Sequence, residues 1–124
     1  MFHGKTITLA IATLAMSAII GSPAQVQEVL ETPGYVVTIT NDCEEGVVVC
    51  DRAIYRGVSK KSGKSITLRG STMHTTCADG ETPCRFLGWR FVSPQGVIYE
   101  VFEDGTLIVR RGERILLRQR GRWR

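Results

Sequence analysis

The sequence predicts an all-β protein, a small antiparallel barrel or sandwich built from consecutive hairpins and stabilised by two disulfides. Short β-branched and aromatic runs alternate with turn-forming residues along most of the chain, which is typical of consecutive hairpins. No window keeps the 3.6-residue apolar periodicity of an amphipathic helix. Four cysteines stand in two pairs with equal spacing. With 124 residues, the chain is expected to form one domain, and its size excludes a multidomain enzyme.

The first 24 residues have the pattern of a cleaved export signal. Lys5 supplies a short positive start, residues 7–20 carry no charge, and small residues precede a cleavage point before Gln25. The uncharged run is shorter than the roughly 20 residues that a membrane-spanning helix needs. We therefore expect a periplasmic or secreted protein rather than a membrane-anchored one.

Strands are predicted where β-branched and aromatic residues gather, and turns where Gly, Pro, Asn or Asp interrupt them. We expect a linker over residues 25–34, the β domain over 35–119 and a basic C-terminal tail over 120–124. The seven predicted strands are, in chain order, residues 35–40, 47–55, 65–68, 85–92, 97–103, 106–110 and 114–119. The turn formers between them include Asn41-Asp42, the polar run 60–64, residues 93–96, Asp104-Gly105 and Gly112-Glu113. Gly88 interrupts the aromatic fourth strand, which indicates a bulge or the close approach of another backbone.

Asp104-Gly105 is the strongest hairpin signal in the chain. As a two-residue turn it pairs Val101 with Ile108. A second two-residue turn at Gly112-Glu113 pairs Arg110 with Ile115 and Ile108 with Leu117. Both faces of the resulting sheet are then apolar, so one packs in the core and the other needs cover. The rest of the chain, a second copy in a homodimer or another partner are the alternatives for that cover.

The cysteines are predicted to form two local disulfides, Cys43–Cys50 and Cys77–Cys84. Export places them in an oxidising compartment, and each pair closes a short loop rich in turn formers. The spacing alone leaves all three connectivities open. A four-cysteine zinc site is the rival interpretation, but structural zinc ligands usually stand two to four residues apart.

Arginine is concentrated at the C-terminus: residues 110–124 hold seven arginines, one glutamate and no lysine. Side chains alternate along a strand, so several of these arginines are expected to share one sheet face and to bind an anion. The candidate binding residues are Arg111, Arg114, Arg118, Arg120, Arg122, Arg124, Trp89 and Trp123. A charged edge strand, a frayed tail and internal ion pairs are the structural alternatives for the arginines. For Trp89, the alternatives are a stacking platform and a core position.

Catalytic signals are weak. His74 is the only histidine after the predicted leader, and hydroxyl side chains beside it permit a nucleophile–base pair. The acidic turn with Asp42, Glu44, Glu45 and nearby Asp51 offers paired carboxylates for glycoside cleavage, although such groups on a turn are usually solvated. We predict no catalytic residue, no cofactor and no metal site.

These observations favour an exported, non-catalytic binding protein that binds or inhibits another protein. Its size, leader and disulfides are similar to those of small periplasmic inhibitor proteins. The alternative is an arginine-mediated module that binds envelope polyanions, lipid head groups or nucleic acid. A small hydrolase that uses His74 is the third and less favoured hypothesis.

Overall fold

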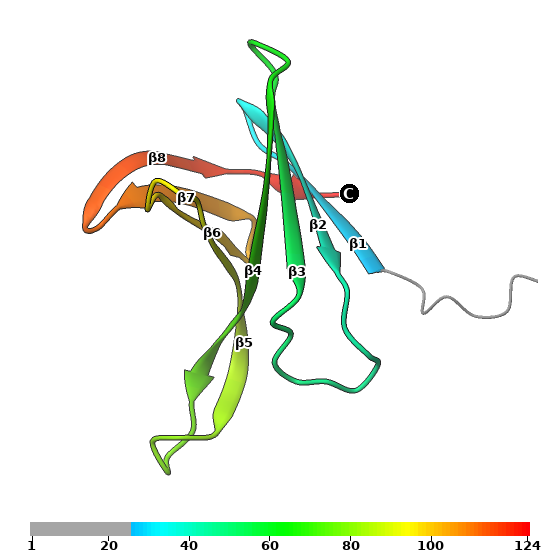
Figure 1. The fold of residues 1–124 in the computed structure, drawn as a ribbon, viewed down its shortest axis with the longest axis vertical. Helices are drawn as coiled ribbons and strands as arrows, with labels where there is room; N and C mark the ends of the chain where they lie inside the picture. Colours follow the sequence, from blue (N-terminus) through cyan, green and yellow to red (C-terminus); the bar gives the residue numbers. More distant parts are fainter. Residues whose placement is uncertain (1–25) are drawn as a thin grey trace, which may run out of the picture.

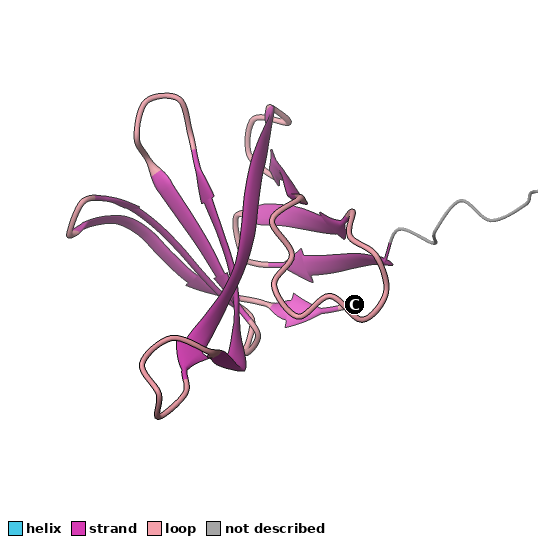
Figure 2. Cartoon of the chain, turned by 60° about the horizontal axis from the view of Figure 1, so that its bottom comes forward, coloured by secondary structure: helices cyan, strands magenta, loops and turns pink. Residues whose placement is uncertain are grey.

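The computed structural model describes residues 26–124, which form one antiparallel sheet that curls into a nearly closed barrel (Figures 1 and 2). The strands are β1 (Val26–Glu31), β2 (Tyr35–Asn41), β3 (Ala53–Ser59), β4 (Ser65–Thr76), β5 (Pro83–Val92), β6 (Ile98–Phe102), β7 (Thr106–Arg111), β8 (Arg114–Arg120) and β9 (Arg122–Trp123). Consecutive strands from β1 to β8 pair with one another, β8 being the last, and β9 pairs with β1. The predicted all-β class is confirmed. Within these residues no helix is long and apolar enough to span a membrane.

The C-terminal segment closes the barrel. After Gly121, β9 pairs with β1 and places Trp123 opposite Leu30. Gln119 at the end of β8 reinforces this junction, because its Oε1 accepts hydrogen bonds from Thr32 Oγ1 at 2.7 Å and from the Gly34 backbone N–H at 3.0 Å. The indole N–H of Trp123 donates to the Glu103 carbonyl at 2.8 Å. The two ends of the sheet therefore meet at this junction, where β9 pairs with the last two residues of β1 and the barrel is nearly closed.

The hydrophobic core fills the middle of the barrel. Inward-facing residues alternate with outward-facing ones along the strands, as expected for a closed antiparallel sheet. The buried core residues are Leu30, Val37, Ile39, Ala53, Tyr55, Leu68, Trp89, Phe91, Val101, Leu107 and Val109. Every strand from β1 to β7 contributes at least one of them. Burial of this single cluster is the main favourable term in folding.

The two segments predicted to flank the β domain belong to the sheet. Residues 25–34 were expected to be a linker, but Val26–Glu31 forms β1 and buries Leu30. Residues 120–124 were expected to be a tail, but Arg120 ends β8 and Arg122–Trp123 forms β9. Each segment lacks a strong local strand signal: β1 pairs with β2 along its whole length, and β9 is held by its pairing with Leu30 and Glu31 of β1. The predicted export signal, residues 1–24, lies outside the described residues.

The second predicted strand, residues 47–55, is wrong in its first half. Residues 42–52 form a loop, and β3 begins only at Ala53 and runs to Ser59. The Cys43–Cys50 disulfide, with a Cα–Cα distance of 5.8 Å, ties the two sides of this loop together. The β-branched residues Val47, Val48 and Val49 are therefore exposed instead of paired in the sheet.

The predicted register of the Asp104-Gly105 hairpin is wrong by one residue. The Gly105 N–H donates to the Phe102 carbonyl at 3.0 Å, and Gly105 has a φ of +93°. The connection therefore has three residues and pairs Val101 with Leu107. A slip of one residue exchanges the two faces of a strand, so Leu107 is buried in place of Ile108.

The β7–β8 hairpin contains a register shift that also alters the predicted pairing. Arg110 pairs with Ile115 as predicted, but Ile108 pairs with Arg118 instead of Leu117. The extra residue lies between Ile115 and Leu117 and reverses the faces of β8 at that point. Gly88 behaves as predicted: the β4–β5 register shifts beside it, and a Cβ there would collide with the Val101 carbonyl.

The outer face of β5, β6 and β7 carries a charged cluster instead of a continuous apolar surface. Glu100 is only 6% exposed and accepts hydrogen bonds from Arg90 at 2.8 Å and from Arg110 at 2.7 Å. Burial by itself would raise the pKa of Glu100, but the hydrogen bonds and positive charges of Arg110 and Arg90 hold it below its ordinary value. This cluster covers part of the second sheet face within the monomer.

Replacement of Trp123 by alanine is expected to lower the free energy of unfolding by about 2–3 kcal/mol. The change removes a half-buried indole that packs at a tilt against Trp89 and helps to close the barrel. Urea unfolding followed by circular dichroism measures the loss. Arg122→Ala, at an exposed position on the same short strand, is the control and is expected to stay within about 0.5 kcal/mol of the parent protein. Equal effects of the two changes would contradict the closing role of Trp123.

The stability of the protein is expected to fall as the pH decreases from about 4.5 to about 2. Hydrogen bonds from Arg124 and Lys60 lower the pKa of Glu31 from its ordinary value of 4.5 to about 2. A carboxyl group with a depressed pKa stabilises the fold above its unfolded-state pKa, and this contribution is lost as the pH falls through the folded-state pKa. Glu31→Gln is expected to flatten this part of the unfolding-free-energy profile. Glu113→Gln in the β7–β8 turn is the control, and an identical profile for the two variants would refute the assignment.

Candidate functional site

The interior of the barrel is hollow on both sides of its core. The larger cavity, about 810 Å³, lies at the end that carries the β2–β3 loop, and a smaller one of about 260 Å³ lies on the other side. A volume of several hundred Å³ is typical of sites that bind small ligands or inserted side chains. The larger cavity is lined by Val26, Glu28, Asn41, Cys43, Glu44, Glu45, Val47, Val48, Cys50, Thr72, His74, Cys84, Phe86 and Trp89.

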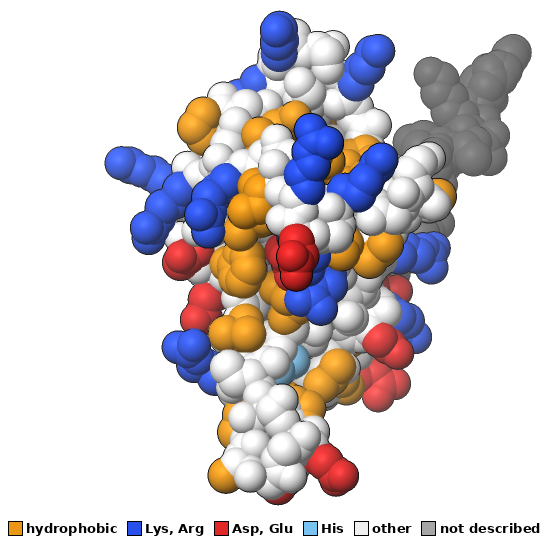
Figure 3. Space-filling view, turned by 90° about the vertical axis from the view of Figure 1, so that its left-hand side faces the viewer, with side chains coloured by type: hydrophobic (Ala, Val, Ile, Leu, Met, Phe, Trp, Pro, Cys, Tyr) orange, Lys and Arg blue, Asp and Glu red, His pale blue; other side chains and the backbone are white. Residues whose placement is uncertain are grey.

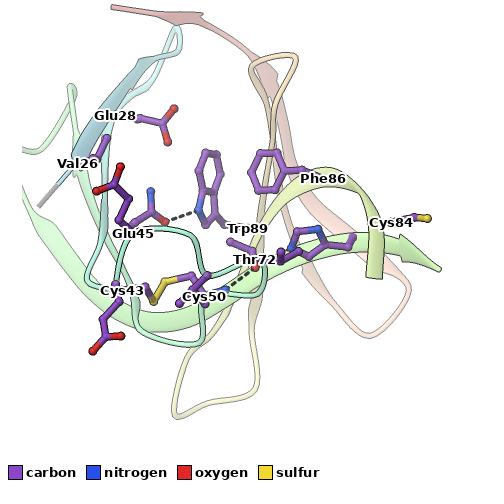
Figure 4. Close-up of a pocket in the computed structure, with 14 residues that line it drawn as sticks. Val26, Glu28, Cys43, Glu45, Cys50, Thr72, Cys84, Phe86 and Trp89 are labelled. Atoms are coloured by element: carbon purple, nitrogen blue, oxygen red, sulfur yellow. Dashed lines mark hydrogen bonds between the residues drawn. A yellow bond between two sulfur atoms is a disulfide. The ribbon is translucent and has the colours of Figure 1, made fainter. Parts of the chain in front are cut away.

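Two aromatic rings form one wall of the larger cavity (Figure 4). Phe86 packs edge-on against Trp89, with their ring centroids 5.0 Å apart. Trp89 is 3% exposed, and its indole N–H donates to Asn41 Oδ1 at 2.9 Å. Trp89 also packs against Trp123, with the ring centroids 5.8 Å apart. Trp89 is thus part of the core and of the cavity wall, and it does not stand free on the outer surface as a stacking platform.

Three carboxylates line the same cavity. Glu28 faces inward because it alternates with outward-facing residues on β1 and lies two residues before the buried Leu30. Glu44 and Glu45 come from the β2–β3 loop, and Figure 4 shows Glu28 and Glu45 on the side of Trp89 away from Phe86. Within residues 26–124, the only carboxylates that form ion pairs are Glu31 and Glu100. The negative charge at this cavity is therefore uncompensated by the described part of the chain.

The loop over residues 42–52 is anchored on both sides and displays apolar side chains between its anchors. Cys50 is buried, its N–H donates to Thr72 Oγ1 at 3.0 Å, and its carbonyl accepts from the Thr72 N–H at 2.9 Å. Between the disulfide-bonded cysteines, Val47, Val48 and Val49 are 42 to 64% exposed, and we call them the valine tip. Two of them also line the larger cavity.

His74 lies in the wall of this cavity and contacts a hydroxyl group. Its Nε2 is 3.0 Å from Thr72 Oγ1, and its ring packs edge-on against Phe86. Its Nδ1 is buried and has no hydrogen-bond partner among the described residues. A catalytic base is usually oriented by a third group bonded to its second nitrogen, and the described residues do not supply one here. The described residues therefore do not form the oriented nucleophile–base pair that the hydrolase hypothesis requires, and that hypothesis stays a prediction.

The arginines divide into two groups. Every second residue from position 118 to the end of the chain is an arginine. These arginines lie on the outer side of the sheet, because Gln119 and Trp123 between them contact the barrel. They are Arg118, Arg120, Arg122 and Arg124. Arg124 forms an ion pair with Glu31 at 2.6 Å. Arg111 and Arg114 pair with each other beside the β7–β8 turn. The register shift in β8 places them on the opposite face from Arg118, contrary to the predicted common face.

Charge separates along the barrel. Lysines of the β3–β4 turn form the upper end in Figure 3, while acidic side chains mark the lower end on this face.

The smaller cavity is lined by tyrosine and aliphatic side chains and has no carboxylate in its wall. Its lining residues are Tyr35, Tyr55, Ile66, Tyr99, Leu107, Val109, Leu116 and Leu117. Burial raises the pKa of the Tyr55 hydroxyl, with smaller effects from Tyr99 and Tyr35. The two cavities therefore differ in charge as well as in size.

Both predicted disulfides are present. Cys43–Cys50 holds the loop at the larger cavity, and Cys77–Cys84 holds the β4–β5 turn, with a Cα–Cα distance of 5.1 Å. All four sulfur atoms are engaged in disulfides, so the four-cysteine zinc alternative is wrong. Neither cavity was predicted from the sequence, because both arise from closure of the sheet around side chains distant in the chain.

No protein-family model, curated protein or solved structure matches this chain. A fold by itself does not define a function, since one architecture carries many different sites. The larger cavity, its carboxylates and the valine tip are therefore the features of this chain that indicate a binding site.

Removal of the Cys43–Cys50 disulfide by a Cys43→Ser/Cys50→Ser double change is expected to release the loop at the larger cavity. The chain-entropy model assigns about 2.5 kcal/mol of stability to a bridge that closes a loop of this length. Amide hydrogen exchange at the valine tip is expected to accelerate, because the loop loses its anchor at Cys43.

The matched control is Cys77→Ser/Cys84→Ser, which opens a loop with the same sequence separation of 7. This control is expected to lose similar stability in urea unfolding but to leave exchange at the valine tip unchanged. Equal exchange at the tip in the two double variants would show that the disulfide does not order this loop.

Proposed function

We propose that this protein is an exported binding protein that recognises another protein through the larger cavity and the valine tip. The observation that carries this proposal is the display of three consecutive exposed valines on a disulfide-held loop at the edge of a cavity of about 810 Å³. Two disulfides are typical of proteins in oxidising extracellular or periplasmic compartments, which supports export.

The valine tip supports a protein partner because exposed apolar groups beside a hollow gain free energy when they are covered. Isolated apolar side chains are common on surfaces, but a run next to a cavity is typical of an interaction site. The disulfide and the backbone hydrogen bonds of Cys50 restrict the loop before binding. Such preorganisation reduces the conformational entropy that is lost on association.

The charges around the tip favour a protein over a lipid surface. The loop holds four acidic side chains and a single basic one, Arg52. Anionic lipid head groups would repel this loop, because a negatively charged leaflet attracts basic segments and not acidic ones. A protein with a basic and apolar surface is complementary to the same loop. Inhibition of that partner is one consequence of binding that this site permits.

A second candidate function uses the outer arginines of β8 and β9. Arg118, Arg120 and Arg122 are exposed and form no ion pair within the described residues. Guanidinium groups at alternating strand positions suit phosphate or carboxylate groups spaced along a polymer. This arrangement supports binding of envelope polyanions, lipid head groups or nucleic acid at a surface separate from the larger cavity.

Val47→Asp/Val48→Asp is expected to abolish capture of a stoichiometric protein partner from an extract of cell envelope. The double change places charge on the apolar tip and should leave the fold intact, because both positions are exposed in a loop. The control is Val92→Asp, at a valine that is 52% exposed on β5 and does not line the cavity. Capture is read as stained stoichiometric bands after washing at low and high salt.

The outcomes separate the two candidate functions. Loss of one band in the tip variant, with retention in the Val92 variant and at high salt, supports the proposed protein partner. Retention in the tip variant together with loss in Arg118→Ala/Arg120→Ala/Arg122→Ala overturns it in favour of polyanion binding. In that case affinity for duplex DNA falls with salt by a slope of about −0.9 per phosphate neutralised.

A further inference from the structure

The larger cavity combines an apolar aromatic wall with carboxylates that lack a cationic partner. We infer that it accepts a lysine or arginine side chain, carried on an apolar segment of the partner protein. This inference rests on the proposed function, because it names the chemistry of the group that enters the site. It depends on the size of the cavity, on its charge and on the contrast with the cavity on the other side of the core.

The cavity has room for an inserted side chain. Its volume of about 810 Å³ far exceeds that of the smaller cavity, about 260 Å³. Trp89 is held in place by its hydrogen bond to Asn41 and by its contacts with Phe86 and Trp123. The wall is therefore already formed, and a long side chain can bury its methylene groups against Phe86 and the adjacent valines.

The charge of the cavity selects a cation. Glu28 comes from β1 and Glu44 and Glu45 come from the loop, so three carboxylates surround one opening. No lysine or arginine is present in the cavity wall, and no ion pair within residues 26–124 includes these three groups. An ammonium or guanidinium group placed among them gains a modest Coulomb energy, because Glu44 and Glu45 are exposed and Glu28 is half-buried. A carboxylate in the same place would be repelled.

The walls of the two cavities differ in their polar groups. The wall of the larger cavity includes Glu28, Glu44, Glu45 and His74, and His74 Nε2 contacts Thr72 Oγ1. The smaller cavity has no carboxylate in its wall, which makes it the internal comparison for charge selection.

The test uses a small probe in place of the partner. Hexylammonium chloride, 1-hexanol and sodium hexanoate share one alkyl stem and differ in charge. Each is titrated at constant ionic strength into the ¹⁵N-labelled, oxidised protein, and the indole N–H resonance of Trp89 is followed by NMR. We expect hexylammonium to shift this resonance with a dissociation constant at least tenfold lower than that of hexanoate, and 1-hexanol to fall between them.

Neutralisation of the carboxylates tests their role. Glu28→Gln/Glu44→Gln/Glu45→Gln is expected to weaken hexylammonium binding about tenfold and to leave 1-hexanol binding unchanged, since partly exposed charges each contribute a modest amount. The matched control is Glu81→Gln/Glu103→Gln/Glu113→Gln, which changes the net charge equally at exposed positions outside the cavity. The dispersion of the amide spectrum verifies that each variant is folded.

Two results would overturn the inference: equal affinity for hexylammonium and 1-hexanol, or equal weakening of hexylammonium binding by the two triple variants. Absence of any shift of the Trp89 resonance by hexylammonium would overturn it as well. Each of these results leaves the proposed function intact if capture of the partner still depends on the valine tip. Conversely, if hexylammonium binds selectively but capture of the partner does not depend on the valine tip, the proposed function is refuted. The charge preference of the cavity would still stand.

Discussion

The C-terminal segment holds the two ends of the sheet together, and the core and both cavities exist because these ends meet. A meander of eight strands leaves unpaired backbone groups on its first and last members unless they meet. Gly121 redirects the chain from β8 to β1, and its N–H donates to the Gly105 carbonyl at 2.8 Å. A Cβ on Gly105 would lie 2.6 Å from the Gly121 carbonyl oxygen, so this crossing requires small residues. Gln119 and Trp123 then hold the closed edge from two sides.

Closure also determines where a ligand can enter. The core occupies the middle of the barrel and leaves a hollow on each side, since the side chains beyond the core do not fill the interior. Trp123 packs behind Trp89, which forms part of the wall of the larger cavity. The segment that completes the sheet therefore also supports the candidate site. Barrel stability and the shape of this cavity depend on the same aromatic contact.

The glutamates discussed above fall into two groups, those that form ion pairs within the described residues and those that line the larger cavity. Glu100 and Glu31 form ion pairs with arginine or lysine and stabilise the sheet. Glu28, Glu44 and Glu45 form none within the described residues and gather at one cavity. Glu44 and Glu45 are exposed and Glu28 is half-buried, so these charges cost folding little and stay available to a ligand. This division connects the electrostatics of the barrel with the proposed binding site.

Local composition and spacing were enough to predict the fold class, the two short-range disulfides, the irregularity at Gly88 and the Arg110–Ile115 pairing, although the structure was needed to choose among the three cysteine connectivities. The strands at residues 26–31 and 122–123 were not predictable from local signals, since β1 is extended through its pairing with β2 and β9 through its pairing with β1, about 90 residues away in the chain. Only the tertiary structure decided the register at Gly105, where a three-residue connection exchanges the faces of β7. The larger cavity was beyond sequence reasoning for the same reason: Glu28, Glu45 and Trp89 lie far apart in the chain, and only closure of the barrel brings them around one space.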